Sequence, residues 1–267
     1  MKLSIKKLAV AVALAATAAS ASAAINDGAL GNGELFFNIW DANGSYSFDL
    51  NKDMSSFIST TAILSSATGT SQVLPAGPFD FEFSLTNFTS FLSTADASTL
   101  QWNVVAGDGS GARRILATYS DMPTERVAAG ELRSLAGAIG QQALAINTEI
   151  GAGDSVIVDA AHAAYAGQVK YGTMYEPLSN FSNAGTLANN SYESGLNFMR
   201  IDAKSSGIAA GVYTQLFANS DAVKVYLDST NNTLHIAAVP EPESYAMLLA
   251  GLGMVGFMAR RRLAKRA

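Results

Sequence analysis

The sequence from residue 34 to residue 50 reads ELFFNIWDANGSYSFDL. Its first part, Glu34–Trp40, is rich in aromatic and large apolar residues, which favour strands. Asn43-Gly44 then forms the tip of a short polar turn, a strong signal for a β-hairpin. After the turn the sequence alternates strictly, with Tyr46, Phe48 and Leu50 on one face and polar residues on the other. The stretch therefore predicts a hairpin and places the chain among mainly β proteins.

The same alternation continues along the chain. Residues 79–85 read FDFEFSL, which predicts a half-buried strand with its aromatic residues on one face. Segments rich in Gly, Ser, Thr and Asn separate further strand candidates. We expect these strands at 99–105, 114–119, 155–158, 196–203, 211–218, 222–227 and 233–239.

One stretch, residues 124–150, has helical spacing instead. Apolar or small residues recur there at steps of three and four: Ala128, Leu132, Leu135, Ile139, Ala143, Ile146 and Ile150. Thr124 is a candidate N-cap. Gly130, Gly137 and Gly140 each weaken a helix by about 1 kcal/mol relative to Ala, so two shorter helices over one end of the sheets would also fit. The predicted body is β-sandwich-like with one or two helices.

The first 23 residues are typical of a secretory signal peptide. Lys2, Lys6 and Lys7 precede an apolar stretch, and Ala21 and Ala23 offer the small side chains that signal peptidase accepts. The apolar stretch is shorter than the roughly 20 residues of a membrane-spanning helix. We therefore expect a signal helix at 1–23, export, and a mature chain that begins near Ala24.

The end of the chain has three unlike parts in order. Pro240-Glu241-Pro242 is held extended because proline fixes its own φ and lacks an N–H group. An uncharged run, 245–259, follows and predicts a short transmembrane helix. Arg260, Arg261 and Arg262 open a basic cluster that should stay cytoplasmic, with the body on the far side of the membrane. A plain C-terminal anchor is the alternative.

This tail resembles the PEP-CTERM sorting signal, the substrate of the exosortase family of membrane transpeptidases. The resemblance implies cleavage near Pro240-Glu241-Pro242, transient anchoring in the inner membrane, and release to the outer surface or the extracellular matrix. Proteins with this signal usually occur in bacteria that make exopolysaccharide. The predicted organisation is thus a signal peptide at 1–23, an extracellular body at 24–239 and a sorting signal at 240–267.

The start of the body is also similar to other PEP-CTERM proteins. The shared features are a Gly-Glu-Leu-Phe stretch at 33–36, the pair Trp40-Asp41 and a Gly-Ser-Tyr turn at 44–46. These relatives imply no activity that can be transferred to this chain.

Composition excludes several classes of function. Of the 17 basic residues eight lie in the two terminal segments, and of the 22 acidic residues only Glu241 and Glu243 do, so the body carries a formal charge of −11. Such a body repels nucleic-acid phosphates. The chain has no cysteine, which excludes disulfides, thiol nucleophiles and cysteine-ligated zinc.

Catalytic and metal motifs are sparse. His162 has no G-x-S-x-G elbow to pair with, and His235 sits at an alternating strand position that predicts a solvent-facing side chain. Residues 41–45, DANGS, resemble the front of a calcium loop but also fit a hairpin turn, and the bidentate Glu that should follow is replaced by Leu50. We predict no metal and no cofactor.

Carboxylates and aromatic residues leave two further alternatives. Asp80 and Glu82 could act as a glycosidase pair, but their alternation with phenylalanines places them on a solvated face. Trp40 and Trp102 could stack on sugar rings or pack in the core. Tyr171 and Tyr175, in a Gly-bearing segment, are candidate carbohydrate contacts.

Three functions remain open. The first is a non-enzymatic surface or matrix protein, processed by signal peptidase and exosortase and associated with exopolysaccharide. The second is a lectin-like carbohydrate-binding module, and the third is a secreted glycan hydrolase.

Overall fold

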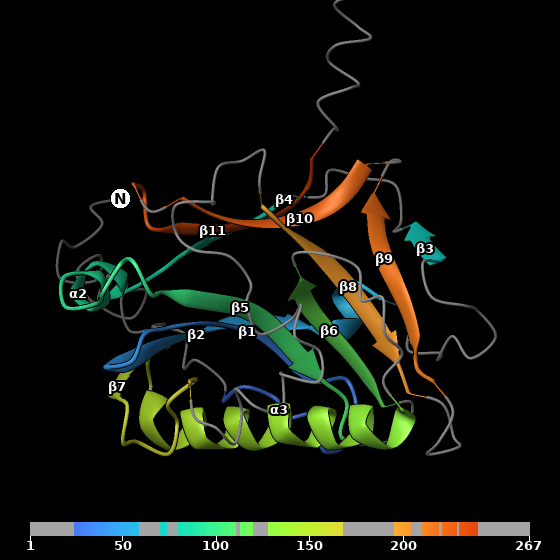
Figure 1. Cartoon of the computed structure of the whole chain (residues 1–267), viewed down its shortest axis with the longest axis horizontal. Coiled ribbons are helices and arrows are strands. Elements are labelled where there is room, and N and C mark those ends of the chain that lie inside the picture. Colours follow the sequence, from blue (N-terminus) through green and yellow to red (C-terminus); the bar gives the residue numbers. More distant parts are fainter. Residues whose placement is uncertain are drawn as a thin grey trace, which may run out of the picture.

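The computed structural model describes residues 24–58, 70–73, 80–110, 113–119, 128–167, 195–203, 210–218, 221–228 and 230–239. Within these ranges the chain is mainly β, as predicted (Figure 1). The strands are β1 (Glu34–Trp40), β2 (Gly44–Asp53), β3 (Thr70–Val73), β4 (Asp80–Ser84), β5 (Gln101–Gly107), β6 (Arg114–Tyr119), β7 (Ser155–Asp159), β8 (Leu196–Asp202), β9 (Val212–Ala218), β10 (Asp221–Asp228) and β11 (Thr233–Val239). The helices are η1 (Met54–Ser56), α2 (Phe88–Leu92) and α3 (Ala129–Ile150).

The strands of the described ranges join in one sheet. Its order is β4-β11-β10-β9-β8-β6-β5-β1-β2-β7, and β3 pairs with β9. The β3–β9 pair is parallel, whereas the other pairs are antiparallel. The predicted hairpin is β1–β2, and the strands expected at 222–227 and 233–239 pair with each other as β10 and β11.

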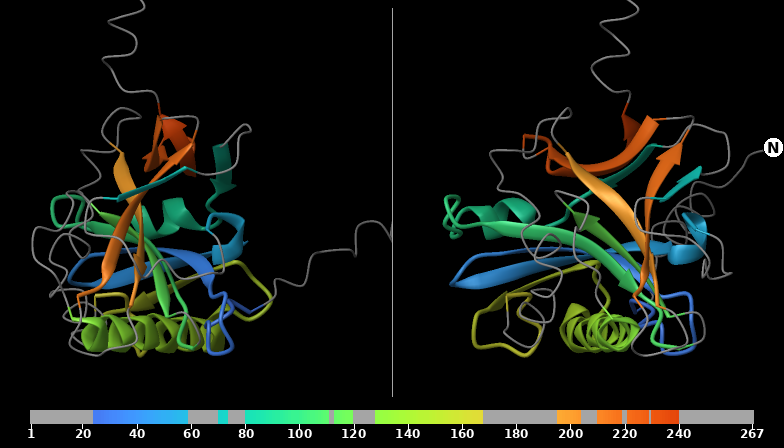
Figure 2. Two further views of the ribbon diagram at one scale, coloured as in Figure 1. Left: turned by 90° about the vertical axis from the view of Figure 1, so that its right-hand side faces the viewer. Right: turned by 45° about the vertical axis from the view of Figure 1, so that its right-hand side comes forward.

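The sheet curls so that its two ends face each other. In Figure 1, β1, β2 and β5 form a lower layer, β4, β10 and β11 form an upper layer, and β6, β8 and β9 run obliquely between them. The views in Figure 2 show the same arrangement. The predicted sandwich-like body is therefore present, but its two layers belong to a single continuous sheet.

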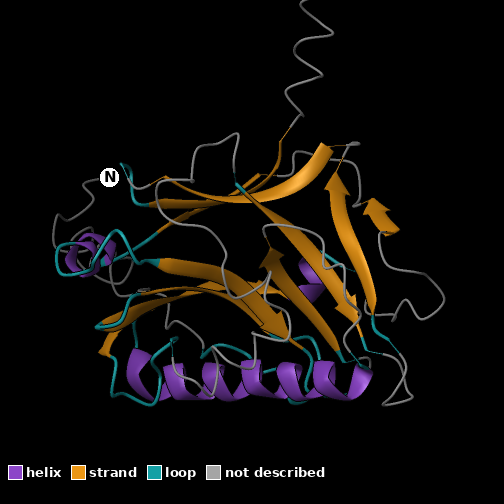
Figure 3. Ribbon diagram, in the orientation of Figure 1, coloured by secondary structure: helices purple, strands orange, loops and turns teal. Residues whose placement is uncertain are grey.

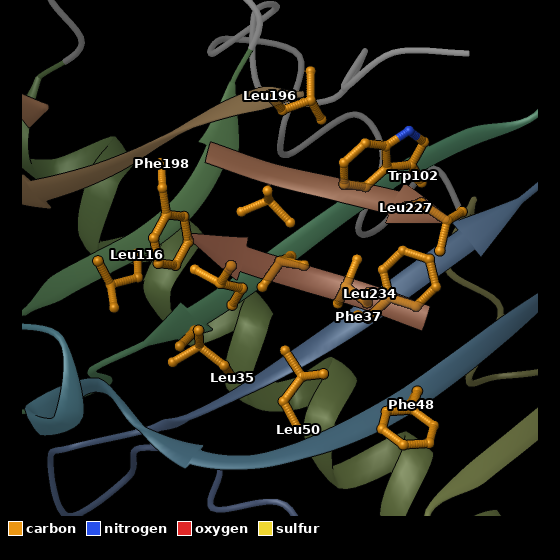
Figure 4. Close-up of a cluster of buried hydrophobic side chains, with 14 of the residues drawn as sticks. Leu35, Phe37, Phe48, Leu50, Trp102, Leu116, Leu196, Phe198, Leu227 and Leu234 are labelled. Carbon is orange, nitrogen blue, oxygen red and sulfur yellow. The ribbon is translucent and has the colours of Figure 1, made fainter. Parts of the chain in front are cut away.

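The main hydrophobic core lies between these layers. Alternate residues of β1 and β2 point into it, including Phe37, Tyr46 and Phe48, and they meet residues of β8, β10 and β11 such as Phe198, Leu227 and Leu234 (Figure 4). Phe81 and Phe83 of β4 pack against the same core, while Asp80, Glu82 and Ser84 are exposed. The alternation predicted for this strand is confirmed.

Helix α3 covers the outer face of the lower layer. Figure 3 shows it as one uninterrupted helix beneath the sheet. A second core forms between its apolar face, with Leu132, Leu135 and Ile139, and outward-facing residues of the sheet such as Phe36 and Ile201. The alternative of two helices over one end of the sheets is wrong, because α3 runs unbroken from Ala129 to Ile150. Packing along the helix outweighs the cost of its glycines. At Gly140 the packing requires glycine, since an added Cβ would lie 2.5 Å from the carbonyl oxygen of Asp27.

The helix also begins later than predicted. Its N-cap is Ala128, which has no side-chain capping bond, and the predicted cap Thr124 lies outside the described residues. The short elements β3, η1 and α2 were not predicted.

Strand β2 extends beyond the predicted end at Leu50. The pairing with β1 shifts between Glu34 and Phe36, and Asn51 has a left-handed φ of 48°. The amide of Asn51 donates to Asp49 Oδ1 at 2.8 Å, a local turn of the kind Asn tolerates. The resulting irregularity turns the last residues of β2 at the edge of the sheet.

Candidate functional site

The predicted sorting, signal-cleavage and carbohydrate-contact residues lie outside the described part of the chain. This applies to Pro240, Glu241 and Pro242, to Arg260, Arg261 and Arg262, to Ala21 and Ala23, and to Tyr171 and Tyr175. The predicted signal helix and C-terminal transmembrane helix lie outside it as well. Within the described residues, strand β11 ends at Val239, directly before the predicted Pro240-Glu241-Pro242 segment.

Among the described residues, no helix combines the length and the apolar character that crossing a bilayer requires.

The candidate calcium loop is a hairpin turn. Asp41 Oδ1 accepts hydrogen bonds from the amides of Asn43 and Gly44 at 2.8 and 3.0 Å, and its Oδ2 accepts from the amide of Asp96 at 2.7 Å. Burial raises the pKa of Asp41, but these donors outweigh it and hold the pKa below its ordinary value. The carboxylate is thus used to close the turn. Within the described ranges no group of three or more metal-ligating side chains is placed to hold an ion.

Trp40 and Ser45, which lie on either side of this turn, contact the segment after β7. Trp40 packs against Tyr165, whose hydroxyl donates to the carbonyl oxygen of Asp41 at 2.5 Å. Ser45 Oγ accepts from the amide of Ala166 at 3.0 Å. The Trp-Asp and Gly-Ser-Tyr features therefore join the first hairpin to the segment after β7, and their role here is structural.

Glu34 is a buried carboxyl at the start of β1. Its side chain accepts a hydrogen bond from the amide of Asn26 at 2.9 Å, and the residue is 8% exposed. Burial raises its pKa to about 7, and the neighbouring Asp49 and Asp53 add to the rise. Glu34 therefore changes charge near neutral pH.

The two histidines occupy structural positions. His162 Nδ1 accepts from the amide of Ala164 at 3.1 Å, and its Nε2 lies 3.6 Å from Glu149 Oε1. His235 stacks on Tyr226 with ring centroids 4.6 Å apart and planes at 2°. Its side chain is only 15% exposed, so it is less open to solvent than the strand alternation predicted, because the Tyr226 ring covers it.

Both tryptophans are buried, which agrees with core packing and not with sugar stacking. Trp102 is fully buried in the main core, where its ring lies 6.1 Å from that of Phe37. Trp40 belongs to the smaller cluster with Tyr165.

Among the described residues, a candidate ligand site lies in the gap between the two edges of the sheet. We call this gap the seam: it runs between β4 on one side and β2 with the turn before β7 on the other. A pocket of about 490 Å³ opens in it, within the ~300–1,000 Å³ range of small-molecule sites. Its lining includes Leu50, Asn51, Glu82, Phe83, Ser84 and Asp154.

Sequence reasoning found only part of this pocket. Glu82 was considered, together with Asp80, as a glycosidase carboxylate, and its alternation with phenylalanines predicted the exposed position that it occupies. Asn51 and Asp154 were missed, since the first follows the predicted end of its strand and the second precedes a strand far along the chain. The turn signal Gly153-Asp154-Ser155 could have drawn attention to Asp154 but could not have placed it beside Glu82.

Comparison with protein families gives a match at the C-terminal side of the chain. Residues 238–262 match the PEP-CTERM protein-sorting motif. The curated proteins and the solved structures yielded no match to this chain.

The matched motif defines a class of exported proteins that exosortase targets and that are transiently anchored in the membrane before surface display. The chain carries this motif at 238–262, overlapping the sorting signal predicted at 240–267, and the described residues before it form a mainly β fold.

Proposed function

We propose that residues 24–239 form the mature body of a non-enzymatic surface or matrix protein that is associated with exopolysaccharide. The observation that carries the proposal is the sorting motif at 238–262, whose first two residues are the last two of β11. Signal peptidase removes 1–23, and exosortase then separates the body from the membrane-anchored tail.

The character of the body supports a structural role. Its carboxylates and amides are committed to the fold in several places, such as Asp41 in the first turn and Asn38 in a buried bond to Asn103 at 3.0 Å. The ion pairs Arg114–Asp108 and Arg200–Asp202 are buried and lie within or between neighbouring strands. Groups used in this way stabilise one rigid scaffold, which suits a protein that persists outside the cell.

A lectin-like module is the second candidate, and the seam pocket is the observation that favours it. A pocket with apolar residues and convergent polar groups is the usual form of a small-molecule site. Tyr171 and Tyr175 stay candidate contacts. If they bind sugar, Tyr171→Ala or Tyr175→Ala should reduce retention of the mature protein on the host's own polysaccharide in a pull-down.

Sorting is tested with Pro240→Ala combined with Pro242→Ala. The double variant should stay in the inner-membrane fraction at full tail length, because the extended motif that exosortase grips is lost. Intact mass and cell fractionation measure this outcome. Pro75→Ala combined with Pro78→Ala is the control, since it changes two prolines outside the motif and should leave sorting unchanged.

Release of the Pro240/Pro242 variant into the medium as efficiently as wild type would contradict the sorting proposal. Association with polysaccharide is tested separately by co-sedimentation of the mature protein with the host's polysaccharide. Absence of co-sedimentation would remove that part of the proposal and leave the sorting part intact. Saccharide release after long incubation would instead indicate a hydrolase.

A further inference from the structure

The seam is closed at its two ends by side chains. At one end the Tyr46 hydroxyl donates to the carbonyl oxygen of Thr86 at 2.8 Å, and Thr86 Oγ1 lies 2.8 Å from Ser155 Oγ and also bonds to Asp154. Burial raises the pKa of Tyr46, so this hydroxyl keeps its proton. At the other end Lys52 Nζ lies 5.5 Å from the centre of the Phe81 ring. The pocket thus lies between these two sets of contacts across the seam.

This closure limits the size and shape of a ligand. An added β-strand would need a free edge along several residues, and it would collide with the side-chain contacts that close the seam at its two ends. A compact unit can enter, because Glu82 and Ser84 are exposed and border the opening. The geometry therefore favours a ring-sized ligand over an extended peptide.

The backbone of β4 adds polar groups to the same opening. The amide of Leu85 donates to the carbonyl oxygen of Asn232, so this residue pair is hydrogen-bonded across β4 and β11. Along an antiparallel ladder, hydrogen-bonded pairs alternate with pairs that are not hydrogen-bonded. Phe83 and Leu234 therefore form the next hydrogen-bonded pair. The N–H and C=O groups of Glu82 and Ser84 consequently point away from β11, into the seam.

The chemistry of the pocket selects a polyhydroxylated, uncharged ligand. Glu82 and Asp154 supply carboxylate acceptors, Asn51 an amide and Ser84 a hydroxyl, while Leu50 and Phe83 supply apolar surface. The described lining holds two carboxylates and no lysine, arginine or histidine, and Lys52 at the end of the seam lies over the Phe81 ring, so the lining disfavours phosphates and uronic acids. A sugar ring combines hydroxyls for the acceptors with a C–H face for the apolar residues.

We propose that the seam pocket binds a neutral hexose unit at a chain end or side branch of a polysaccharide. This inference rests on the proposed association with exopolysaccharide and names the surface responsible for it. The irregularity of β2 at Asn51 contributes directly, since it turns the end of that strand at the pocket.

The test uses the mature protein released from the host and titration calorimetry. The probes are neutral hexasaccharides of glucose, mannose and galactose, with an oligouronate of equal length as the charged comparison. Wild type should bind at least one neutral hexasaccharide and bind the oligouronate at least about tenfold more weakly. Free monosaccharides added as competitors distinguish recognition of a chain end from recognition of a single sugar.

Two variants assign the binding to the seam. Glu82→Ala removes an acceptor, and Ser84→Trp places a large side chain in the opening; each should weaken binding at least about tenfold. Asp80→Ala is the matched control: it lies on the same exposed face of β4 but does not line the pocket, and it should change affinity less than about twofold. Circular dichroism confirms that each variant is folded.

Three results would overturn the seam assignment. The first is no binding of any neutral hexasaccharide at ~10 mM, a concentration well above the weak end of specific affinities. The others are unchanged binding in both Glu82→Ala and Ser84→Trp, and a preference for the oligouronate. If the protein still co-sediments with the host's polysaccharide in any of these cases, the proposed function stands and the contact lies elsewhere. If co-sedimentation also fails, both proposals fail.

Discussion

Glu34 illustrates how this fold sets the charge of a single residue. Its folded-state pKa of about 7 lies above the ordinary value of 4.5, because burial disfavours the charged form. The folded state therefore holds the proton more tightly than the unfolded chain does. Folding stability is unaffected by this group below about pH 4.5, falls as pH rises toward 7, and stays reduced above that.

Glu34→Gln should remove this pH-dependent loss. The amide stays neutral and keeps an oxygen to accept from Asn26, so we expect the variant to be more stable than wild type by about 2–3 kcal/mol at pH 8. At pH 4 the two proteins should differ little. Urea unfolding at both pH values measures the difference.

Glu131→Gln on the exposed surface of α3 is the control for this experiment, and it should not reproduce the pH-dependent gain. An equal stability of Glu34→Gln and wild type at pH 8 would show that Glu34 ionises as freely as an exposed carboxylate.

Helix α3 shows how one element can contain two glycines with opposite roles. A Cβ at Gly140 would lie 2.5 Å from the carbonyl oxygen of Asp27, whereas a Cβ at Gly137 would have no neighbour within 4 Å. The first glycine lets the helix approach the segment before β1 closely. The second only weakens the helix by its backbone entropy.

Alanine substitutions should therefore act in opposite directions. Gly137→Ala should stabilise the protein by about 1 kcal/mol, the difference in helix propensity. Gly140→Ala should destabilise it by roughly 1–3 kcal/mol, because backbone must move to admit the methyl group. Thermal or denaturant unfolding compares them directly, and each variant serves as the other's control. A stabilising Gly140→Ala would mean that Asp27 moves aside without cost.

At the scale of the whole molecule, the curled sheet makes both layers depend on one core. Residues of β1 and β2 contact those of β10 and β11 across this core, although they lie far apart in the sequence. If either layer unfolded, the apolar side chains of the other layer would be exposed to solvent. We expect the body to unfold as one unit.

The mature protein should accordingly show a single cooperative unfolding transition. The two tryptophans, Trp40 and Trp102, report different clusters, so the variants Trp40→Phe and Trp102→Phe each leave one local reporter. In each variant the fluorescence midpoint should coincide with its own circular-dichroism midpoint. Separated midpoints would indicate two independently unfolding parts and would contradict a single body at 24–239.

The sequence by itself determined the features that depend on neighbouring residues. The resemblance of the tail to the PEP-CTERM signal predicted the sorting motif, which matches at 238–262. Strict alternation and the Asn-Gly turn predicted the first hairpin, and helical spacing predicted α3. These patterns are readable because local geometry has fixed periods: two residues for a strand and 3.6 for a helix. The same periodicity put Glu82 on the exposed face of β4.

Only the tertiary structure decided which distant segments meet. The polar face of β2 is buried rather than solvated. There Ser47 Oγ donates to Asn38 Oδ1 at 2.7 Å, and Gln142 Nε2 of α3 donates to the same oxygen at 3.3 Å. The seam likewise brings Asn51, Glu82 and Asp154 together from three separate parts of the chain. Such placements depend on how the whole sheet curls and on what covers each of its faces. Both are set by packing between residues far apart in the sequence, which no local pattern encodes.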